Sequence, residues 1–224
     1  MGILRADVYG SPNIGVYCHS NETTAILPPG MTKKKAENVR QYLGVRICVT
    51  NIGGCALVGV LVASNSNGIV FPHTIYDHEL NAIRESLEVK VAVAQERWTA
   101  LGNLVLANDN GAVIHPGAPE SLAKTVAGTL NVDIVTATIG GLPYVGSLAV
   151  ATNNGVLAYD AITDRERAII EKALRVPVET GTINGGVRYI RAGLLANTKG
   201  AVVGPLTSGP ELMAITRTLG IDQR

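Results

Sequence analysis

The chain has 224 residues, of which 46% are hydrophobic and only 4% aromatic, and its 19 Lys and Arg nearly balance 18 Asp and Glu. The resulting net charge of +1 argues against a protein whose affinity rests on neutralising many phosphates, because that mode needs a clustered cationic surplus. Phe71 and Trp98 are the sole Phe and Trp, so the sequence predicts a core of Val, Ile, Leu and Ala, which suits β-strands and small repeats.

Cysteine usage and hydropathy predict the cellular compartment. Cys18, Cys48 and Cys55 are an odd number confined to the first quarter of the chain, which is no disulfide framework for a secreted protein. The longest apolar run, residues 55–63, is too short to span a bilayer, and the first residues lack the features of a signal peptide. We therefore expect a cytoplasmic protein that does not associate with membranes.

The predicted elements begin with an alternating strand over residues 3–9. A hairpin over 16–29, a helix that ends at Leu43 and an alternating strand over 45–49 follow it. The order of hairpin, helix and strand then returns in four further copies. The later hairpins cover residues 61–72, 106–116, 148–159 and 193–205, and the first three of these contain an Asn-Gly turn, which is typical of a β-hairpin.

Helix boundaries in the later copies follow local signals. Thr163 and Ser208 each precede a Glu by three residues, a spacing at which side chain and backbone cap each other. The helical patterns end at Leu87, Leu130, Leu174 and Leu219, and strands over 89–93, 132–136 and 176–180 follow the first three. Gly-Gly pairs at 53–54, 140–141 and 185–186 then close copies one, three and four.

These copies recur at a nearly fixed period. The turn glycines Gly68, Gly111, Gly155 and Gly200 are 43, 44 and 45 residues apart, and Thr24 holds the matching place in the first copy. The leucines that end the helices recur at intervals of 44, 43, 44 and 45. A unit of two hairpin strands, one helix and one strand cannot bury both of its faces alone, so each unit must lean on its neighbours.

The sequence therefore predicts an α/β fold with five ββαβ repeats of about 44 residues in a single domain that covers residues 1–224. The repeats are approximately residues 10–54, 55–99, 100–143, 144–188 and 189–224. Copy five lacks its last strand, and Arg5 stands 44 residues before Val49, so residues 1–9 occupy the missing register. We expect this strand to close a propeller-like, pseudo-fivefold ring in which the two termini meet and no open edge is left.

One equivalent position in each repeat is expected to lie at one end of the ring. Counting back nine residues from the turn position gives Gly15, Gly59, Gly102, Gly146 and Arg191. Each is expected at the start of an inner strand. By repeat symmetry, these residues and their neighbours should gather at one end of the ring.

Six motifs occur together in one order: NIGV (13–16), NIGGCALVG (51–59), TIYDHELNAIRESL (74–87), QERWTALGN (95–103), AVIHP (112–116) and GTINGG (181–186). Over the whole chain they resemble the translation initiation factor 6 family in its archaeal form, which has the pentein fold. The resemblance implies a non-enzymatic anti-association factor that needs no cofactor or metal. Members bind the large ribosomal subunit on the face that contacts the small subunit, and so block premature joining.

The resemblance also implies partners and contact residues. The main family contact is a ribosomal protein beside the sarcin-ricin loop, and release requires a translocase-type GTPase aided by a Shwachman-Diamond family protein. We expect a monomer that acts in initiation or in ribosome biogenesis. The candidate ribosome-binding rim residues are Gly15, Val60, Trp98, Asn103, Asn184, Gly185 and Tyr189, and Lys33, Lys34 and Lys35 are candidate contacts to ribosomal RNA. Of the rim residues, Gly15 and Asn103 match the family's own.

Each candidate also has a structural interpretation. Glycine at a strand start lets backbones approach closely around a narrow pore, and we favour this role for Gly59 and Gly146. Asn103 can make a local bond to the backbone, and Trp98 can fill an aliphatic core. The three lysines can form a solvated charge run.

Two other functions stay open as alternatives. A guanidine-modifying pentein hydrolase or amidinotransferase needs a Cys nucleophile, and those enzymes place it near the C-terminus, whereas the last Cys here is Cys55. A generic protein-binding scaffold without a ribosomal role is the third possibility, because fold does not dictate function. Only the family motifs argue against the scaffold.

Overall fold

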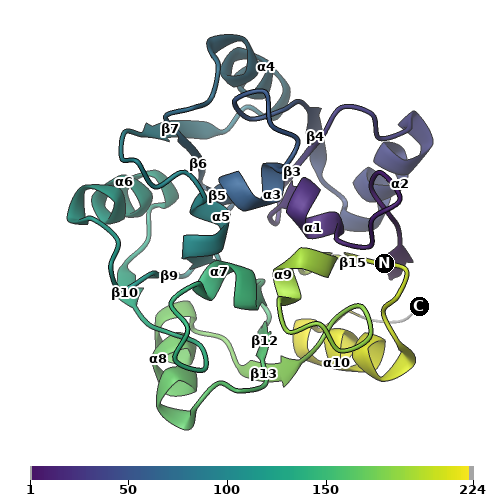
Figure 1. The fold of residues 1–224 in the computed structure, drawn as a ribbon, viewed down its shortest axis with the longest axis vertical. Helices are drawn as coiled ribbons and strands as arrows, with labels where there is room; N and C mark the ends of the chain where they lie inside the picture. Colours follow the sequence, from purple (N-terminus) through teal and green to yellow (C-terminus); the bar gives the residue numbers. More distant parts are fainter. Residues whose placement is uncertain (1, 222–224) are drawn as a thin grey trace.

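Five similar units lie around a common centre in the computed structural model, which describes residues 2–221 (Figure 1). Each unit contains a three-stranded sheet, an outer helix of eleven residues and a one-turn helix near the centre. The predicted α/β class and the repeated order of hairpin, helix and strand are confirmed. The one-turn helices are an addition that the sequence analysis did not contain.

The element bounds show the repetition directly. The sheets are β2 (His19–Ser20), β3 (Thr24–Leu27) and β4 (Arg46–Val49); β5 (Ala63–Ser64), β6 (Gly68–Pro72) and β7 (Lys90–Ala94); β8 (Val105–Ala107), β9 (Ala112–Ile114) and β10 (Ile134–Thr136); β11 (Ala149–Ala151), β12 (Val156–Tyr159) and β13 (Val178–Gly181); β14 (Leu194–Ala196), β15 (Ala201–Val203) and β1 (Ile3–Arg5). The outer helices are α2 (Lys33–Leu43), α4 (Asp77–Leu87), α6 (Glu120–Leu130), α8 (Asp164–Leu174) and α10 (Gly209–Leu219). The one-turn helices are α1 (Ile14–Tyr17), α3 (Val58–Leu61), α5 (Leu101–Leu104), α7 (Val145–Leu148) and α9 (Ile190–Gly193).

The outer helices end at the five predicted leucines, and each end has a local cause. The next residue adopts the left-handed conformation, with φ between 47° and 63°, and its N–H bonds back into the last helical turn. Glycine holds this place after α2 and α10, which accommodates the positive φ without steric cost. Each helix buries one apolar stripe against the sheets, and most of its polar residues face outward.

The hydrophobic core is divided into clusters that are shared between neighbouring units. One cluster joins Leu106 and Val113 of the third unit to Ile170 and Leu174 of the fourth. Another contains Phe71, the largest fully buried side chain of the described residues. Because each sheet completes its core with the helix of the following unit, no unit can bury its apolar surface by itself.

The N-terminal strand joins the sheet of the last unit, as predicted. β1 pairs in parallel with β15, with Arg5 opposite Val203, and β15 pairs antiparallel with β14. In the first unit, Val49 of β4 lies opposite Leu27 in the same way, which confirms the predicted register. The chain end at 222–224, which the predicted meeting of the termini concerns, lies outside the described residues.

The hairpin turns differ from the Asn-Gly prediction. The strands are joined by loops of three or four residues, such as 108–111, and the turn glycines have no positive φ. Their role is close packing, because a Cβ on Gly111 would lie 2.0 Å from the carbonyl oxygen of Ala173 in the next unit. The preceding Asn108 accepts hydrogen bonds from the loop N–H groups and donates from Nδ2 to Leu174 O at 2.9 Å, so one buried amide shapes the turn and joins two units.

Candidate functional site

The five one-turn helices surround the centre of one face, which we call the helical-turn face (Figure 1). The sequence placed four glycines and Arg191 at the starts of inner strands, and this is wrong: each is the second residue of a one-turn helix. Backbone bonds close these turns, for example from Cys18 N to Ile14 O at 2.8 Å. The turns thereby satisfy polar backbone groups that would otherwise be buried without partners where the chain enters the inner strand.

Glycine at this position is required by the contact between neighbouring turns. A Cβ on Gly15 would lie 1.8 Å from Arg191 O, and one on Gly59 would lie 1.9 Å from Gly15 O. The corresponding distances are 2.0 Å from Gly102 to Gly59 O and 2.3 Å from Gly146 to Gly102 O. The close-approach interpretation of Gly59 and Gly146 is thus confirmed. Arg191 is the one member of the set that carries a side chain.

A central depression of about 520 Å³ opens on the helical-turn face. Four candidate rim residues line it: Gly15, Val60, Asn103 and Tyr189. They come from four different units, so the repeat symmetry brings them together as expected. Gly15 contributes only backbone, whereas the side chain of Asn103 is half-buried and makes no hydrogen bond within residues 2–221.

The other rim candidates lie elsewhere and make structural contacts. Asn184 is buried, with Nδ2 donating to Pro12 O at 3.0 Å, and the N–H of Gly185 donates to Glu211. Trp98 is half-buried against an apolar cluster and meets His115 edge-on at 4.9 Å between ring centroids. None of the three lines the depression.

The three lysines divide into two groups at the start of α2. Lys33 and Lys34 are exposed, and α2 lies at the periphery of the molecule (Figure 1). The Nζ of Lys35 is 2.8 Å from Asp7 Oδ1, so this lysine ties α2 to the segment after β1. Lys33 and Lys34 thus point to solvent, whereas Lys35 is held in an ion pair at the surface.

Arg191 lies at the base of the depression, and its guanidinium makes contacts that leave its charge uncompensated. Nη2 donates to His19 Nδ1 at 2.6 Å, and Nε donates to Gly59 O at 3.3 Å. His19 Nε2 lies 2.5 Å from Ser64 Oγ, and because Nδ1 accepts from Arg191, Nε2 carries the proton. Within residues 2–221, no carboxylate oxygen lies within 4 Å of the Arg191 guanidinium.

Burial changes the pKa of both groups of this pair. Burial and the charge of Arg191 lower the pKa of His19 well below its usual range, so the imidazole is neutral. Burial lowers the pKa of Arg191 to about 10, which leaves the guanidinium protonated at neutral pH. The pair therefore carries one positive charge at the centre of the molecule.

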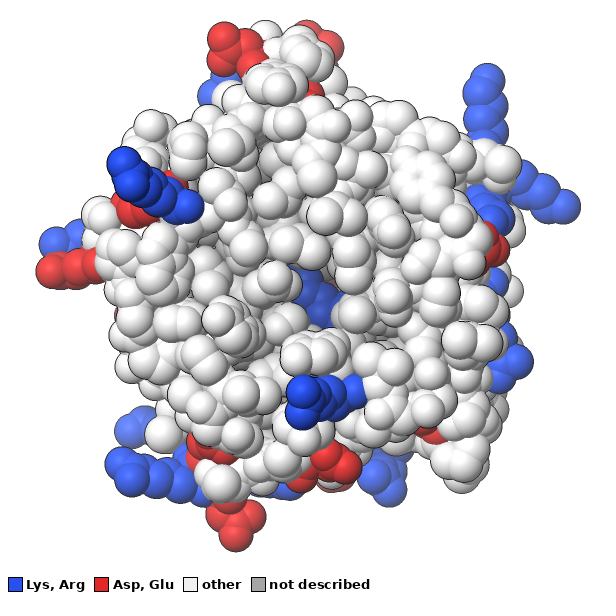
Figure 2. Space-filling view, in the orientation of Figure 1, with Lys and Arg blue, Asp and Glu red and all other residues white. Residues whose placement is uncertain are grey.

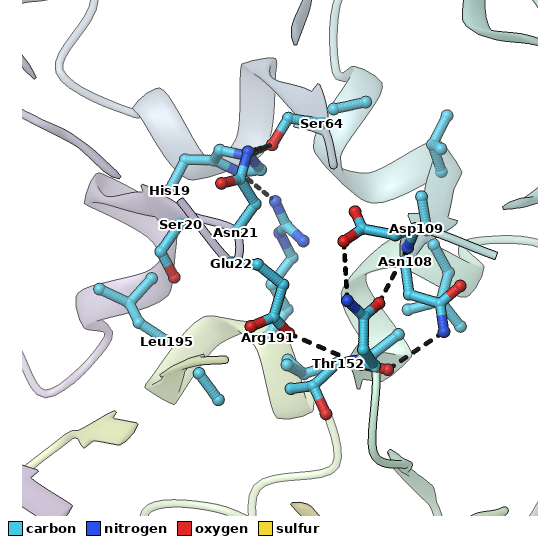
Figure 3. A pocket seen from close by; sticks show the side chains of 18 of the residues that line it. His19, Ser20, Asn21, Glu22, Ser64, Asn108, Asp109, Thr152, Arg191 and Leu195 are labelled. Atoms are coloured by element: carbon cyan, nitrogen blue, oxygen red, sulfur yellow. Dashed lines mark hydrogen bonds between the residues drawn. The ribbon is translucent and has the colours of Figure 1, made fainter. Parts of the chain in front are cut away.

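An inner chamber of about 40 Å³ lies beyond Arg191, on the side of the hairpin turns (Figure 3). Two carboxylates line it, and neutral donors satisfy both of them. Asp109 accepts from Ser66 Oγ at 2.8 Å, and Glu22 accepts from Thr198 Oγ1 at 2.7 Å. Within the described part of the chain, Arg191 alone lines both the chamber and the depression.

Sequence reasoning missed Tyr144 and the role of Arg191. Tyr144 precedes α7 as Tyr189 precedes α9, 45 residues later, and both line the depression, so the repeat register could have found it. Arg191 stands where the other four units have glycine, and this break in the pattern was the available signal. That its side chain enters the centre could not be read from the sequence.

The described residues offer binding groups more readily than catalytic ones. Burial raises the pKa of the Cys18 thiol to about 12 and also raises that of Cys48, which disfavours the reactive thiolate. Among residues 2–221, no group of three His, Cys, Asp or Glu side chains is placed to hold a metal ion. No described helix is long and apolar enough to cross a bilayer.

Comparison with solved structures supports the assignment of the fold. A neighbour among solved structures is a mutant of DDAH from Pseudomonas aeruginosa complexed with citrulline, a pentein-fold enzyme, with a TM-score of 0.51. It shares 14% sequence identity, and the match covers 80% of this chain and 71% of that chain. At this identity the likeness shows the pentein fold alone.

Sequence comparison identifies the family. Translation initiation factor 6 of Saccharolobus islandicus (strain L.S.2.15 / Lassen #1) is 36% identical over 98% of this chain and 100% of its own length. The factor of the same name from Methanoculleus marisnigri is 36% identical over 96% of both chains, and that of Methanosarcina acetivorans is 42% identical over 47% of this chain and 49% of its own. The eIF-6 family model matches residues 3–218. The chain therefore belongs to the eIF-6 family, whose matched relatives are archaeal translation initiation factors.

Proposed function

We propose that this chain binds the large ribosomal subunit through its helical-turn face and so prevents premature joining of the small subunit. The observation that carries the proposal is the gathering of Gly15, Val60, Asn103 and Tyr189 in one depression. The repeat register and the family resemblance both point to these residues, which come from four different units. A single docking site accounts for their common location.

The character of this face suits a protein partner. Figure 2 shows mostly uncharged side chains over its centre, with acidic and basic side chains mainly at the periphery. Large apolar and aromatic side chains are exposed around the depression: Leu57, Tyr144, Val187 and Tyr189. Aromatic enrichment and depletion of charge are typical of the core of a protein interface. This supports the ribosomal protein beside the sarcin-ricin loop as the main contact.

The remaining partners follow from the family resemblance. Lys33 and Lys34 are exposed away from the depression and can add contacts to ribosomal RNA, so raised salt should weaken binding modestly. We propose that the factor acts as a cytoplasmic monomer folded as one domain. A translocase-type GTPase, aided by a Shwachman-Diamond family protein, would release it from the subunit.

A binding role is also favoured over catalysis. The guanidine-modifying enzymes need a thiolate with a nearby base, and the pKa values of the Cys18 and Cys48 thiols are raised. His19, next to Cys18, is held by Arg191 and Ser64. These contacts support a non-enzymatic function.

Sedimentation with separated ribosomal subunits tests the proposal. The protein should pellet with the large subunit alone, and the loaded subunit should fail to join added small subunits. Asn103→Ala should weaken this binding about tenfold without changing the melting temperature, because the Asn103 side chain lines the depression and makes no internal hydrogen bond.

The matched control removes an amide from another surface. The Asn81→Ala variant changes an exposed residue of α4 and should leave binding to the large subunit unchanged. Equal affinity of the Asn103 and Asn81 variants would remove Asn103 from the contact surface. A protein that pellets with neither subunit would overturn the proposed function.

A further inference from the structure

The base of the central depression carries a charge that the molecule itself does not neutralise. The Arg191 guanidinium contacts a neutral imidazole and backbone carbonyls, and no carboxylate of the described residues pairs with it. Figure 2 shows a basic side chain at the bottom of the central hollow, and Arg191 is the only Lys or Arg of the described residues that lines the depression. A buried charge is retained at a cost unless a partner compensates it.

The two sides of Arg191 differ in what they would accept. On the inner side, the chamber of about 40 Å³ contains the carboxylates Glu22 and Asp109, which would repel an anion. On the outer side, no Asp or Glu among residues 2–221 lines the depression of about 520 Å³. An anion would therefore approach Arg191 from the helical-turn face.

The walls of the depression restrict the kind of anion. Val16, Val60, Tyr144 and Tyr189 supply apolar and aromatic surface, and the Asn103 amide has no internal hydrogen-bond partner. A phosphate backbone is normally held by several cations, whereas this site offers one guanidinium. One guanidinium and one amide that line the same depression match a single carboxylate, which can accept charge-assisted hydrogen bonds from such donors.

We propose that the depression receives an acidic side chain, Asp or Glu, from a protein partner, with Arg191 as the group that binds its carboxylate. The apolar walls would hold aliphatic residues that flank this side chain on the partner. The inference rests on the proposed function, because it takes the protein docked on the helical-turn face as the source of the carboxylate. The inference adds a chemical requirement, a carboxylate on the partner, which blocking of subunit joining does not by itself imply.

Binding of short peptides to the isolated protein tests this chemistry without a ribosome. The probes are acetyl-Leu-Glu-Leu-amide and its neutral counterpart acetyl-Leu-Gln-Leu-amide, followed through the NMR signals of the Val16 and Val60 methyl groups and Arg191 Nε. The Glu peptide should give saturable shifts and bind at least tenfold more tightly than the Gln peptide. Inorganic phosphate at the same concentration should not displace it.

Two variants assign the preference to one guanidinium. Arg191→Met keeps the length of the side chain and removes its charge, so the Glu and Gln peptides should bind equally. Arg188→Met removes a charge three residues away and should keep the preference, because Arg188 stacks on Tyr159 and Tyr189 but does not itself line the depression. Equal binding of both peptides to the unaltered protein, or stronger binding of phosphate, would overturn the inference even if Arg191→Met failed to fold.

Sedimentation with the large subunit separates this inference from the proposed function. If both hold, Arg191→Met should bind the subunit at least tenfold more weakly than Arg188→Met. If the unaltered protein binds the subunit but shows no preference for the Glu peptide, the carboxylate inference fails and the docking proposal stands. If it prefers the Glu peptide but binds no subunit, the docking proposal fails.

Discussion

At the scale of single residues, the centre of the molecule depends on the absence of four side chains. Gly15, Gly59, Gly102 and Gly146 each bring a backbone carbonyl of a neighbouring turn closer than a Cβ would allow. This packing also shapes the depression, because the same turns form its walls. The residues that hold the candidate site in place are therefore mostly distinct from those with side chains free to contact a partner, such as Asn103.

Gly59→Ala should reduce the free energy of unfolding by about 1–3 kcal/mol, because its Cβ would meet Gly15 O at 1.9 Å and force the two turns apart. Gly128→Ala is the matched control: Gly128 lies in α6, a Cβ there meets nothing within 4 Å, and alanine should stabilise the helix by up to about 1 kcal/mol. Urea unfolding of both variants measures the difference. Two variants of equal stability would contradict the packing argument.

At the scale of elements, one carboxylate joins each of three outer helices to a Gly-Gly turn. Glu211 accepts from the N–H groups of Gly185 and Gly186 at 3.0 and 2.9 Å and from Ser208 N at 2.7 Å. Glu79 and Glu166 make the same contacts to 53–54 and 140–141. The Gly-Gly pairs, which only marked the ends of copies in the sequence, thus bind the helix-capping glutamates.

Glu211→Gln should lower the free energy of unfolding by about 1–3 kcal/mol at pH 7, because the new NH₂ group faces N–H and O–H donors. Burial alone would raise the pKa of Glu211, but the hydrogen bonds from Ser208, Thr182 and Gly185 outweigh it and lower the pKa to about 2. The stabilisation is therefore full above pH 4.5 and is lost as pH falls towards 2, so the gap between wild type and variant should close in acid.

Unfolding curves from pH 7 to pH 2 measure this gap, with Glu120→Gln as the control. Glu120 forms an exposed pair with Lys124 on α6, so its loss should change stability by less than about 0.5 kcal/mol at every pH. A gap that stayed constant through pH 4.5 to 2 would show that the Glu211 carboxylate is not the stabilising group.

The elements differ in how far the sequence could predict them, for physical reasons. The outer helices span three turns with a clear apolar stripe, so the sequence predicts the leucines at their C-terminal ends to the residue, and the capping boxes at Thr163 and Ser208 predict the starts of α8 and α10. The one-turn helices contain four residues each, which is too short for a helical period to show. The register still predicted that Gly15, Val60, Asn103 and Tyr189 share one end, because that inference needs only symmetry.

Contacts that break the repeat symmetry could not be predicted from the sequence. Asn184 has the right position along the chain, but its side-chain amide donates to Pro12 O. Lys35 replaces the helix-capping Glu of other units and pairs with Asp7 instead. Each of these depends on a partner distant in sequence, which periodicity does not identify.

At the scale of the whole molecule, buried side chains hold each repeat to its neighbours. Buried amides join successive units: Asn65 Nδ2 donates to Leu130 O at 2.9 Å, and Asn197 Nδ2 donates from the last unit back to Leu43 O in the first at 2.7 Å. The core clusters are shared in the same way. A disturbance at the junction of the first and last units should therefore spread to the rest of the chain.

The N-terminal strand is the place to test this cooperativity. Its backbone is tied to β15 by bonds from Ala6 N to Val203 O at 2.9 Å and from Ala201 N to Gly2 O at 3.1 Å. A chain that begins at residue 10 leaves β15 with an unpaired edge and should melt at a lower temperature in a single transition. It should also associate with itself as its concentration rises, because an open edge accepts a strand from another copy.

A peptide of residues 2–9, added in trans, should raise the melting temperature of the shortened chain, because the peptide binds only the folded form. Above the dissociation constant, the rise should be proportional to the logarithm of the peptide concentration. A peptide with Leu4 and Ala6 changed to proline is the control, since it cannot donate the N–H groups that β15 accepts. If the shortened chain melted like the full one, or lost only its last unit in a separate transition, the five units would not form one closed cooperative ring. If only the unaltered peptide restored the melting temperature, pairing of β1 with β15 would be the contact that completes the ring.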